Sequence, residues 1–317
     1  MTPTVASPAP DVWLRPDAKP RRVLVIHNPV AGGRRASRLR ATIEALMQRH
    51  GADVTVWATS KRGDAEAMAA AVEPGRYDAV AVAGGDGTIG EAINGFAART
   101  VPVNAPLGIV PLGTANVLAH ELGLPFDAGG IAALLAAGSV RPIHLGVANG
   151  RHFSMMAGVG LDARVVEGVS TGLKRMVGKA AYATSTLVQL CAGSNRLYRV
   201  TVDGEGWEAA SVIVANGRFY GGQFVCAPRA SLTERGLHVC LFSRPGPWNA
   251  MRYMCGMAMG RLHRLPDYRV IPAAAVSIEG PAGEPVQADG DIIARLPVRI
   301  ASAARSLPVL APAGSAS

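Results

Sequence analysis

Apolar and polar positions divide the chain into two halves with different periodicity. In the first half, short and nearly continuous apolar runs alternate with helical spacing, as in Val23–His27 followed by Arg35–His50. The same alternation predicts strands at Val54–Ala58, Ala79–Ala83 and Leu107–Val110, and helices at Asp64–Val72, Ile89–Phe96 and Thr114–Leu122. Strands that are apolar at almost every position are typical of a parallel sheet with helices on both faces.

The second half changes to period-two alternation with glycine-bearing turns, which indicates antiparallel strands. Strands are predicted at Leu197–Asp203, Ser211–Ala215, Leu237–Phe242, Ala275–Glu279 and Val286–Ala288, and a helix at Lys179–Leu190. A length of 317 residues also favours two domains. We therefore predict a disordered leader over 1–20, an α/β domain over 21–143 and a β-rich domain over 144–295. A strand near 296–310 is predicted to return to the first domain.

Composition narrows the class of partner. The formal net charge of +9 favours polyanions, either nucleic acid or an anionic bilayer, and aromatic residues at 5% give a base-stacking surface little support. The four cysteines lack a CxxC pair, so free thiols are expected instead of a zinc site. The N-terminus has no signal-peptide core, and the uncharged run Thr100–Ala119 carries prolines that a membrane helix rarely holds together. We expect a cytoplasmic protein with peripheral membrane contact at most.

The strongest local signal is Gly84-Gly85-Asp86-Gly87-Thr88, where a strand runs into glycines and then a helix. Glycines let backbone N–H groups approach an anion, and a helix N-terminus favours negative charge. Asp86 fits such a site when a nucleotide phosphate brings Mg²⁺. One alternative is a tight turn with Asp86 as N-cap. Another is the dinucleotide pattern Gly85-x-Gly87-x-x-Gly90, which follows the third strand instead of the first and lacks the acidic residue that binds ribose.

Two other strand ends carry residues suited to phosphate. The first is Asn28-Pro29-Val30-Ala31-Gly32-Gly33-Arg34, which enters an arginine-bearing helix but lacks the Walker ending. The second is Gly113-Thr114-Ala115-Asn116, with Thr114 as a candidate N-cap. Each is also compatible with an ordinary turn. Because ligands of open α/β sheets bind at the carboxyl ends of the strands, we expect all three junctions at one edge.

Acidic residues in the second half supply candidates for proton transfer and metal binding. Gln287-Ala288-Asp289-Gly290-Asp291 places two carboxylates around a glycine, as a hairpin turn does. A carboxylate in a cleft can also take the proton of an attacking hydroxyl. Gly160-Leu161-Asp162-Ala163 is a weaker case of the same kind, with Asp162 as a candidate metal ligand.

Taken together, these segments resemble the diacylglycerol kinase catalytic family, which includes bacterial lipid kinases and sphingosine kinases. They occur in family order across residues 22–295. The matching segments are Asn28-Pro29-x-x-Gly32, Thr59 with Gly63-Asp64-Ala65, Gly84-Gly85-Asp86-Gly87-Thr88, Gly113-Thr114-x-Asn116, Gly160-x-Asp162-Ala163, Asn216-Gly217 with Tyr220-Gly221-Gly222, and Asp289-Gly290-Asp291.

The resemblance implies an α/β nucleotide domain of the NAD-kinase/diacylglycerol-kinase type, a C-terminal antiparallel β-sandwich and an active site in the cleft between them. It also implies ATP and Mg²⁺ as cofactors and a lipid hydroxyl at a membrane surface as acceptor. Asp86 is expected to hold Mg²⁺ through water. The candidate nucleotide-binding residues are Asn28, Pro29, Gly32, Gly33, Arg34, Thr59, Gly84, Gly85, Asp86, Gly87, Thr88, Gly113, Thr114 and Asn116.

The resemblance leaves the catalytic base open among three carboxylates. The family's Asp-Gly-Glu motif, which supplies the base, matches Asp289-Gly290-Asp291. Because Asp291 is one methylene shorter than Glu, Asp289 is a rival. Asp86 matches the base favoured in the sphingosine kinase branch.

Two further departures from the family concern metal. Val117 stands where the family often has an Asp, which removes a carboxylate from the Mg²⁺–water network. Arg235 stands where the family has the Asp of a structural Mg²⁺ loop. We hypothesise that the Arg235 guanidinium replaces that metal.

The predicted function is ATP-dependent phosphorylation of a diacylglycerol-like lipid hydroxyl. Met155-Met156 and the methionines of Met251–Met259 are candidates for lining a lipid groove, with core packing as the alternative. Basic residues are candidates for contact with anionic headgroups, namely Lys174, Arg175, Lys179, Arg261 and Arg264. The alternatives are an NAD-kinase-like kinase of a soluble substrate and a non-catalytic nucleotide- or lipid-binding module.

Overall fold

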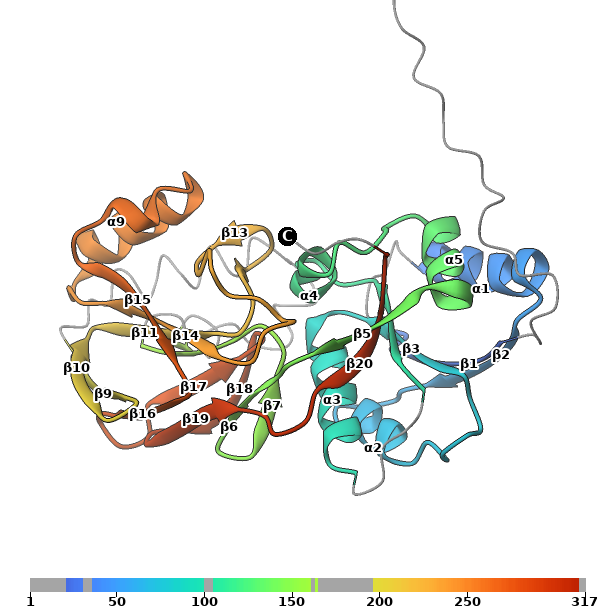
Figure 1. The fold of residues 1–317 in the computed structure, drawn as a ribbon, viewed down its shortest axis with the longest axis horizontal. Helices are drawn as coiled ribbons and strands as arrows, with labels where there is room; N and C mark the ends of the chain where they lie inside the picture. Colours follow the sequence, from blue (N-terminus) through green and yellow to red (C-terminus); the bar gives the residue numbers. More distant parts are fainter. Residues whose placement is uncertain (1–20, 31–35, 100–104, 161–162, 165–195, 314–317) are drawn as a thin grey trace, which may run out of the picture.

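The computed structural model describes residues 21–30, 36–99, 105–160, 163–164 and 196–313. An α/β domain and a β domain lie side by side in it (Figure 1). Several predictions fall outside the described residues. They concern the leader over 1–20, Gly32, Gly33, Arg34, Asp162, the helix Lys179–Leu190, and the basic residues Lys174, Arg175 and Lys179.

The first domain is built on a six-stranded sheet in the order β2-β1-β3-β4-β20-β5. Its parallel strands are β1 (Arg22–His27), β2 (Asp53–Ala58), β3 (Ala79–Gly84) and β4 (Leu107–Pro111), as the apolar runs predict. β20 (Leu307–Ala311) joins β4 in parallel, and β5 (Ser139–Ile143) pairs antiparallel with β20. A segment near the C-terminus is therefore part of the first sheet.

Helices cover both faces of this sheet. α1 (Ala36–His50) packs against α5 (Ala128–Ala137), and α2 (Asp64–Ala70) packs against α3 (Asp86–Ala97), as Figure 1 shows. The prediction for α3 began too late, because the glycine-rich sequence forms its first turn. α4 (Val117–Glu121) is shorter than the predicted helix. Its N-cap is Asn116, at φ 47°, and not Thr114.

The second domain is an antiparallel sandwich of two six-stranded sheets, ordered β10-β9-β16-β19-β6-β7 and β15-β14-β11-β8-β17-β18. The first sheet contains β6 (Gly146–Ala148), β7 (Arg151–Phe153), β9 (Tyr198–Val202), β10 (Glu205–Ala209), β16 (Ala275–Glu279) and β19 (Val298–Ser302). The second contains β8 (Met156–Val159), β11 (Ser211–Ala215), β14 (Leu237–Phe242), β15 (Tyr268–Ala273), β17 (Pro285–Ala288) and β18 (Asp291–Arg295). Buried side chains from both sheets form its core, among them Val200 and Val214.

Smaller elements flank this sandwich, and the first strand of the hairpin among them contacts α4 of the first domain. They are the hairpin β12 (Phe219–Tyr220) and β13 (Phe224–Val225), helix α9 (Pro247–Ala258) and the short helix η2 (Leu262–Arg264). α9 packs against η2 and also contacts β13. Within the part of the chain that the structure describes, no helix has the length and apolar character needed to span a bilayer.

Candidate active site

The two domains meet along helix α3 and strand β7. The Asn94 side chain donates to the His152 carbonyl and accepts from the His152 amide, at 2.9 Å each, so it pairs with β7 as a neighbouring strand would. Beside it, the Arg151 guanidinium donates to both oxygens of Glu66, at 2.8 and 2.9 Å. These contacts fix β7 against α2 and α3 and so position the second domain relative to the glycine-rich turn.

A hollow of about 120 Å³ opens between the domains beside these contacts. Its walls come from α2 and the turn before it, from α3, from β7 and from the β17–β18 hairpin. Glycine and charged side chains share the lining, including Arg62, Gly63, Glu66, Gly87, Arg151 and Asp291. Charges of both signs therefore face one small space at the N-terminal half of α3.

The turns after β3 and β4 touch each other backbone to backbone. A Cβ on Gly113 would lie 2.5 Å from the Cα of Gly85, which no side chain can occupy without moving the chain. A Cβ on Gly84 would lie 2.6 Å from that of Thr88. These glycines thus have a packing role whether or not they contact phosphate, and they bring two of the three predicted junctions together.

Asp86 is the first residue of α3, and its carboxylate caps a different helix. Its oxygens accept hydrogen bonds from the backbone amides of Asn116, at 2.9 Å, and Val117, at 2.7 Å, where α4 begins. Gly85 is the N-cap of α3 itself, so the alternative of Asp86 as that cap is wrong. Burial raises the pKa of Asp86, and the charge of Asp289 adds to this effect, while the two amides oppose it.

The turn after β1 is tied to α3 by a side-chain contact. The Asn28 amide donates to the Thr88 hydroxyl at 3.0 Å, and its oxygen accepts from the Val30 amide at 3.0 Å. The backbone amide of Thr59 donates to the His27 carbonyl at 2.8 Å, and Thr59 is buried at the end of β2. The described part of this junction therefore meets the glycine-rich turn.

Asp289 occupies the left-handed position of the β17–β18 turn, at φ 47°, and its carboxylate is fully bound by the protein. One oxygen accepts from the Ser154 amide at 2.6 Å and the Ser154 hydroxyl at 2.8 Å. The other accepts from the amides of Met155, at 2.9 Å, and Met156, at 3.0 Å. Burial raises the pKa of Asp289 against these four donors. The side chain holds the hairpin on β8.

Asp291, two residues later, points the other way, across the domain boundary. One oxygen lies 3.0 Å from the position that a Cβ on Gly87 would take, in the first turn of α3. The other lies 3.3 Å from the Arg62 guanidinium. The Asp291 side chain is 32% exposed. A solvent-accessible carboxylate from the second domain therefore faces the N-terminus of a helix in the first.

Comparison with known proteins assigns the chain to a protein family. Residues 22–148 match the model of the diacylglycerol kinase catalytic domain, and residues 155–311 match that of the YegS C-terminal NAD kinase beta sandwich-like domain. The two matches fall on the two structural domains in order. The chain belongs to the diacylglycerol kinase catalytic family. It is therefore an enzyme of the kinase class.

Relatives across the whole chain agree with this assignment. A diacylglycerol kinase of Bacillus subtilis is 28% identical over 298 residues, which cover 92% of this chain and 97% of the relative. A Pseudomonas aeruginosa protein named "Probable lipid kinase YegS-like" is 29% identical over 300 residues, covering 94% and 96%. A crystal structure of a diacylglycerol kinase from Bacillus anthracis has a TM-score of 0.77 at 26% identity, covering 94% of this chain and 100% of that one.

Four charged residues that line the hollow were not predicted from the sequence, namely Arg62, Glu66, Glu91 and Arg151. Arg62 directly precedes the Gly63-Asp64-Ala65 segment, and this adjacency could have marked it as a site residue. Glu66 and Arg151 are 85 residues apart and form their pair only where the domains meet. No local pattern marks such a contact.

A further interdomain link explains the Asn216-Gly217 segment. The Asn216 amide donates to the carbonyls of His144, at 2.9 Å, and Ser154, at 2.7 Å. The next residues approach α4, where the Glu121 carboxylate accepts from the backbone amide and the guanidinium of Arg218, at 3.1 Å each. The bonds of Asn216 fix this segment within the second domain, and the contact between Arg218 and Glu121 holds the two domains together at a second point.

Other predicted positions lie away from the hollow. Thr114 is exposed at the turn after β4, whereas Met155 and Met156 are buried in the core, which is the packing alternative for that pair. Arg235 is exposed, and the Leu232 carbonyl accepts from the His144 amide at 2.7 Å. The replacement of a structural metal by Arg235 stays a hypothesis.

The described residues do not assemble a metal site of their own. Among them, no group of three His, Cys, Asp or Glu side chains lies close enough to hold a metal ion. The Asp86 oxygens each accept a backbone amide, so this carboxylate fits a metal through water better than by direct ligation.

Proposed function

We propose that the kinase transfers the γ-phosphate of ATP to the hydroxyl of a diacylglycerol-like lipid at a membrane surface, with Asp291 as general base. Family membership and the names of the relatives support the substrate class. The geometry supports the choice of base. Of the three candidate carboxylates, Asp86 and Asp289 have both oxygens bound by the protein, and Asp291 is the one that faces the hollow.

The helix N-terminus supplies the proposed phosphate site. Amide groups in the first turn of α3 point out of the helix, and a helix N-terminus favours an anion. Gly87 keeps this turn open on the side of Asp291. The Arg62 guanidinium lies along the same hollow, 3.3 Å from Asp291, while that of Arg151 is bound to Glu66. Gly32, Gly33 and Arg34 remain proposed nucleotide ligands, and Arg34 is proposed to offset charge on the transferred group.

The proposed reaction needs one proton transfer and one displacement. Asp291 accepts the proton of the lipid hydroxyl while the oxygen of that hydroxyl bonds to the γ-phosphorus. The bond from that phosphorus to the bridging oxygen then breaks, and ADP leaves with the electron pair. Mg²⁺ carried by the nucleotide supplies neutralisation of phosphate charge, and Asp86 is proposed to hold it through water. Asp289 holds the turn that aims Asp291.

Replacement of the base tests this proposal. Asp291→Asn is nearly isosteric but cannot accept the proton. We expect a loss of turnover of about 100-fold or more, because general bases typically contribute at least that factor. Nucleotide binding should change little. The measurement is transfer of labelled phosphate from ATP to diacylglycerol in mixed micelles, with nucleotide affinity measured in parallel.

A control and two opposing outcomes complete this test. Asp203→Asn alters an exposed turn carboxylate in the β9–β10 hairpin and should leave transfer unchanged. Full activity of Asp291→Asn would exclude Asp291 as the base and turn attention to Asp86. Phosphorylation of NAD in place of any lipid would favour the soluble-substrate kinase. Nucleotide binding without transfer would favour the binding module.

A further inference from the structure

Helix α9 exposes an apolar stripe on the face opposite its buried side. Trp248 is 86% exposed, and Met251 and Met254 are 39% and 40% exposed. Met259, just past the helix end, is 61% exposed. At 100° per residue these side chains share one arc of the helix. Scattered apolar residues are ordinary on a surface, but a tryptophan and three methionines gathered on one face need an explanation.

The opposite face of α9 is firmly held, so the stripe is not a loosely packed core. Tyr253 is buried, and its ring packs edge-on against Phe242, which in turn contacts the ring of Tyr268. Gly256 is also buried, and a Cβ there would lie 3.5 Å from the Leu262 backbone. The helix therefore has a fixed inner face, and its orientation presents the stripe to solvent.

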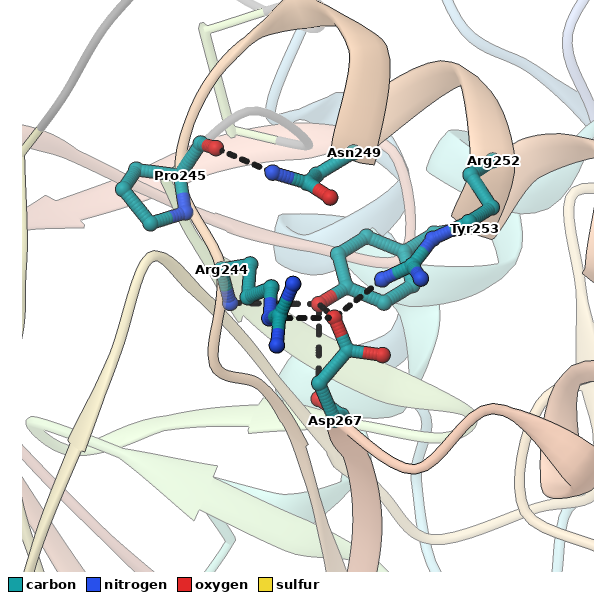
Figure 2. A network of polar contacts seen from close by, with 6 residues as sticks. All are labelled: Arg244, Pro245, Asn249, Arg252, Tyr253 and Asp267. Atoms are coloured by element: carbon teal, nitrogen blue, oxygen red, sulfur yellow. Dashed lines mark hydrogen bonds and ion pairs between the residues drawn. The ribbon is translucent and has the colours of Figure 1, made fainter.

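A buried carboxylate network anchors the same side (Figure 2). The Asp267 carboxylate accepts from the Tyr253 hydroxyl at 2.7 Å and pairs with Arg252, while Arg244 lies 3.6 Å away. Burial and the bond to Asp267 raise the pKa of Tyr253 to about 12, so its hydroxyl remains a donor. Asn249 caps the turn by donating to the Pro245 carbonyl at 2.8 Å. In Figure 2 the side chains of Arg244, Arg252 and Tyr253 converge on Asp267.

The charge around the stripe has one sign. From Ser243 to Pro266 the sequence contains four arginines and no Asp or Glu. The next acidic residue, Asp267, is buried in the network beneath the helix. Arg261 and Arg264 are exposed beyond the end of α9. An apolar stripe flanked by arginines, on a segment whose adjoining carboxylate Asp267 is buried, is complementary to an anionic lipid surface and not to a neutral protein groove.

A further exposed apolar side chain belongs to a strand that contacts α9. Phe224 of β13 is 48% exposed, and β13 contacts α9. Indole rings favour the interface between hydrocarbon and headgroups, and methionine side chains adapt to flexible acyl chains. An aromatic ring beside the helix would enlarge the inserted area.

We propose that α9 is a membrane-docking helix, which inserts Trp248, Met251, Met254 and Met259 into an anionic bilayer while Arg261 and Arg264 contact headgroup phosphates. The inference rests on the proposed function in one respect: the acceptor lipid is held in that bilayer. It assigns Met251, Met254 and Met259 to contact with the bilayer surface and not to a groove in the β domain. Docking by α9 needs no nucleotide and no turnover.

Vesicle flotation tests this surface directly. The full chain is mixed with vesicles of phosphatidylcholine and phosphatidylglycerol, without ATP or diacylglycerol, and the bound fraction is measured at rising salt. We expect Trp248→Ser combined with Met251→Ser to lower the partition coefficient about tenfold or more, since each removes apolar area from the bilayer. Arg261→Ala with Arg264→Ala should lower it about fivefold per charge at low salt and flatten its salt dependence.

The matched control is Met47→Ser, which removes a methionine that is 53% exposed on α1, in the other domain, and should float as the wild type does. Asp291→Asn should also float normally, so a failure of docking and a failure of the proposed catalysis give different results. Unfolding midpoints check that the variants fold. They should match the wild type, because none of the substituted side chains belongs to the buried network.

Three outcomes would overturn the proposal. The first is wild-type protein that does not float on anionic vesicles at low salt. The second is flotation that is unchanged by the Trp248 and Met251 substitutions, which would place the docking surface elsewhere. The third is a vesicle-free protein that changes from dimer to monomer when the stripe is altered, which would make a second copy of this chain the occupant.

Discussion

The glycine-rich junction of the first domain and the β17–β18 hairpin of the second domain each contain a carboxylate that the backbone binds. Asp86 accepts two amides where α4 begins, and Asp289 accepts three amides and a hydroxyl from Ser154–Met156. The hairpin differs because a second carboxylate, Asp291, follows two residues later and remains exposed to the hollow. The contrast separates two roles: bound carboxylates set the shape of each turn, and the exposed one is available for chemistry.

Asp289→Asn is expected to have the largest effect on stability. The amide side chain would present N–H groups to at least one of the four donors, at a residue that is partly buried. Breaking a buried charged network of this kind typically costs about 3–5 kcal/mol. Urea unfolding should show this loss, and activity should fall as the aim of Asp291 is lost.

Asp203→Asn provides the matched control for that experiment. Asp203 also has φ 47°, and its carboxylate accepts from the amides of Ala274 and Ala275, but it lies on the surface. Water can replace the lost acceptor there, so we expect a cost of about 1 kcal/mol. Equal costs at the two sites would show that burial does not distinguish them.

The sequence predicts the frame of both turns but not the partners of their carboxylates. Apolar runs such as Ala79–Ala83 locate the parallel strands because burial on both faces requires them to be apolar throughout. The two-domain fold of the diacylglycerol kinase family is confirmed. By contrast, Asp86 binds the amides of Asn116 and Val117, 30 and 31 residues away, and no local pattern encodes that contact.

Element boundaries and minor helices were harder to predict for a physical reason. Thr114 has the chemistry of an N-cap. The contact between Gly113 and Gly85 fixes the path of the turn, however, and Asn116, in the left-handed region, is the N-cap of α4. Helix α9 was missed because its apolar residues occur on both the buried and the exposed face, so no single stripe marks it. Pro247 after Gly246 was its available start signal.

Gly87→Ala tests the contact between the glycine-rich turn and the exposed carboxylate of Asp291. The added Cβ would lie 3.0 Å from an Asp291 oxygen and would displace that carboxylate from the helix N-terminus. We expect transfer to lipid to fall several-fold, while stability stays level or rises by up to about 1 kcal/mol, because alanine favours a helix. Phosphate transfer and urea unfolding measure the two effects on one variant.

A double mutant identifies the cause of that loss. In an Asp291→Asn background, Gly87→Ala should lower the residual transfer much less than it does alone, since both changes act on the same contact. Fully additive losses would mean that Gly87 acts through the nucleotide and not through Asp291.

Glu66→Gln is expected to have the smallest effect, because it removes an ion pair that is only partly buried. The Arg151 guanidinium lowers the pKa of Glu66 from its ordinary value of 4.5. The stabilisation from this pair is therefore present above the unfolded pKa and is lost as pH falls through the lower folded pKa. At neutral pH the substitution should lower the free energy of unfolding by less than about 1 kcal/mol, and this difference from the wild type should disappear at acid pH. A difference in free energy of unfolding that persists at low pH would assign the effect to packing of α2 on β7. The β17–β18 hairpin would then be positioned over Gly87 by packing and not by the charge of this ion pair.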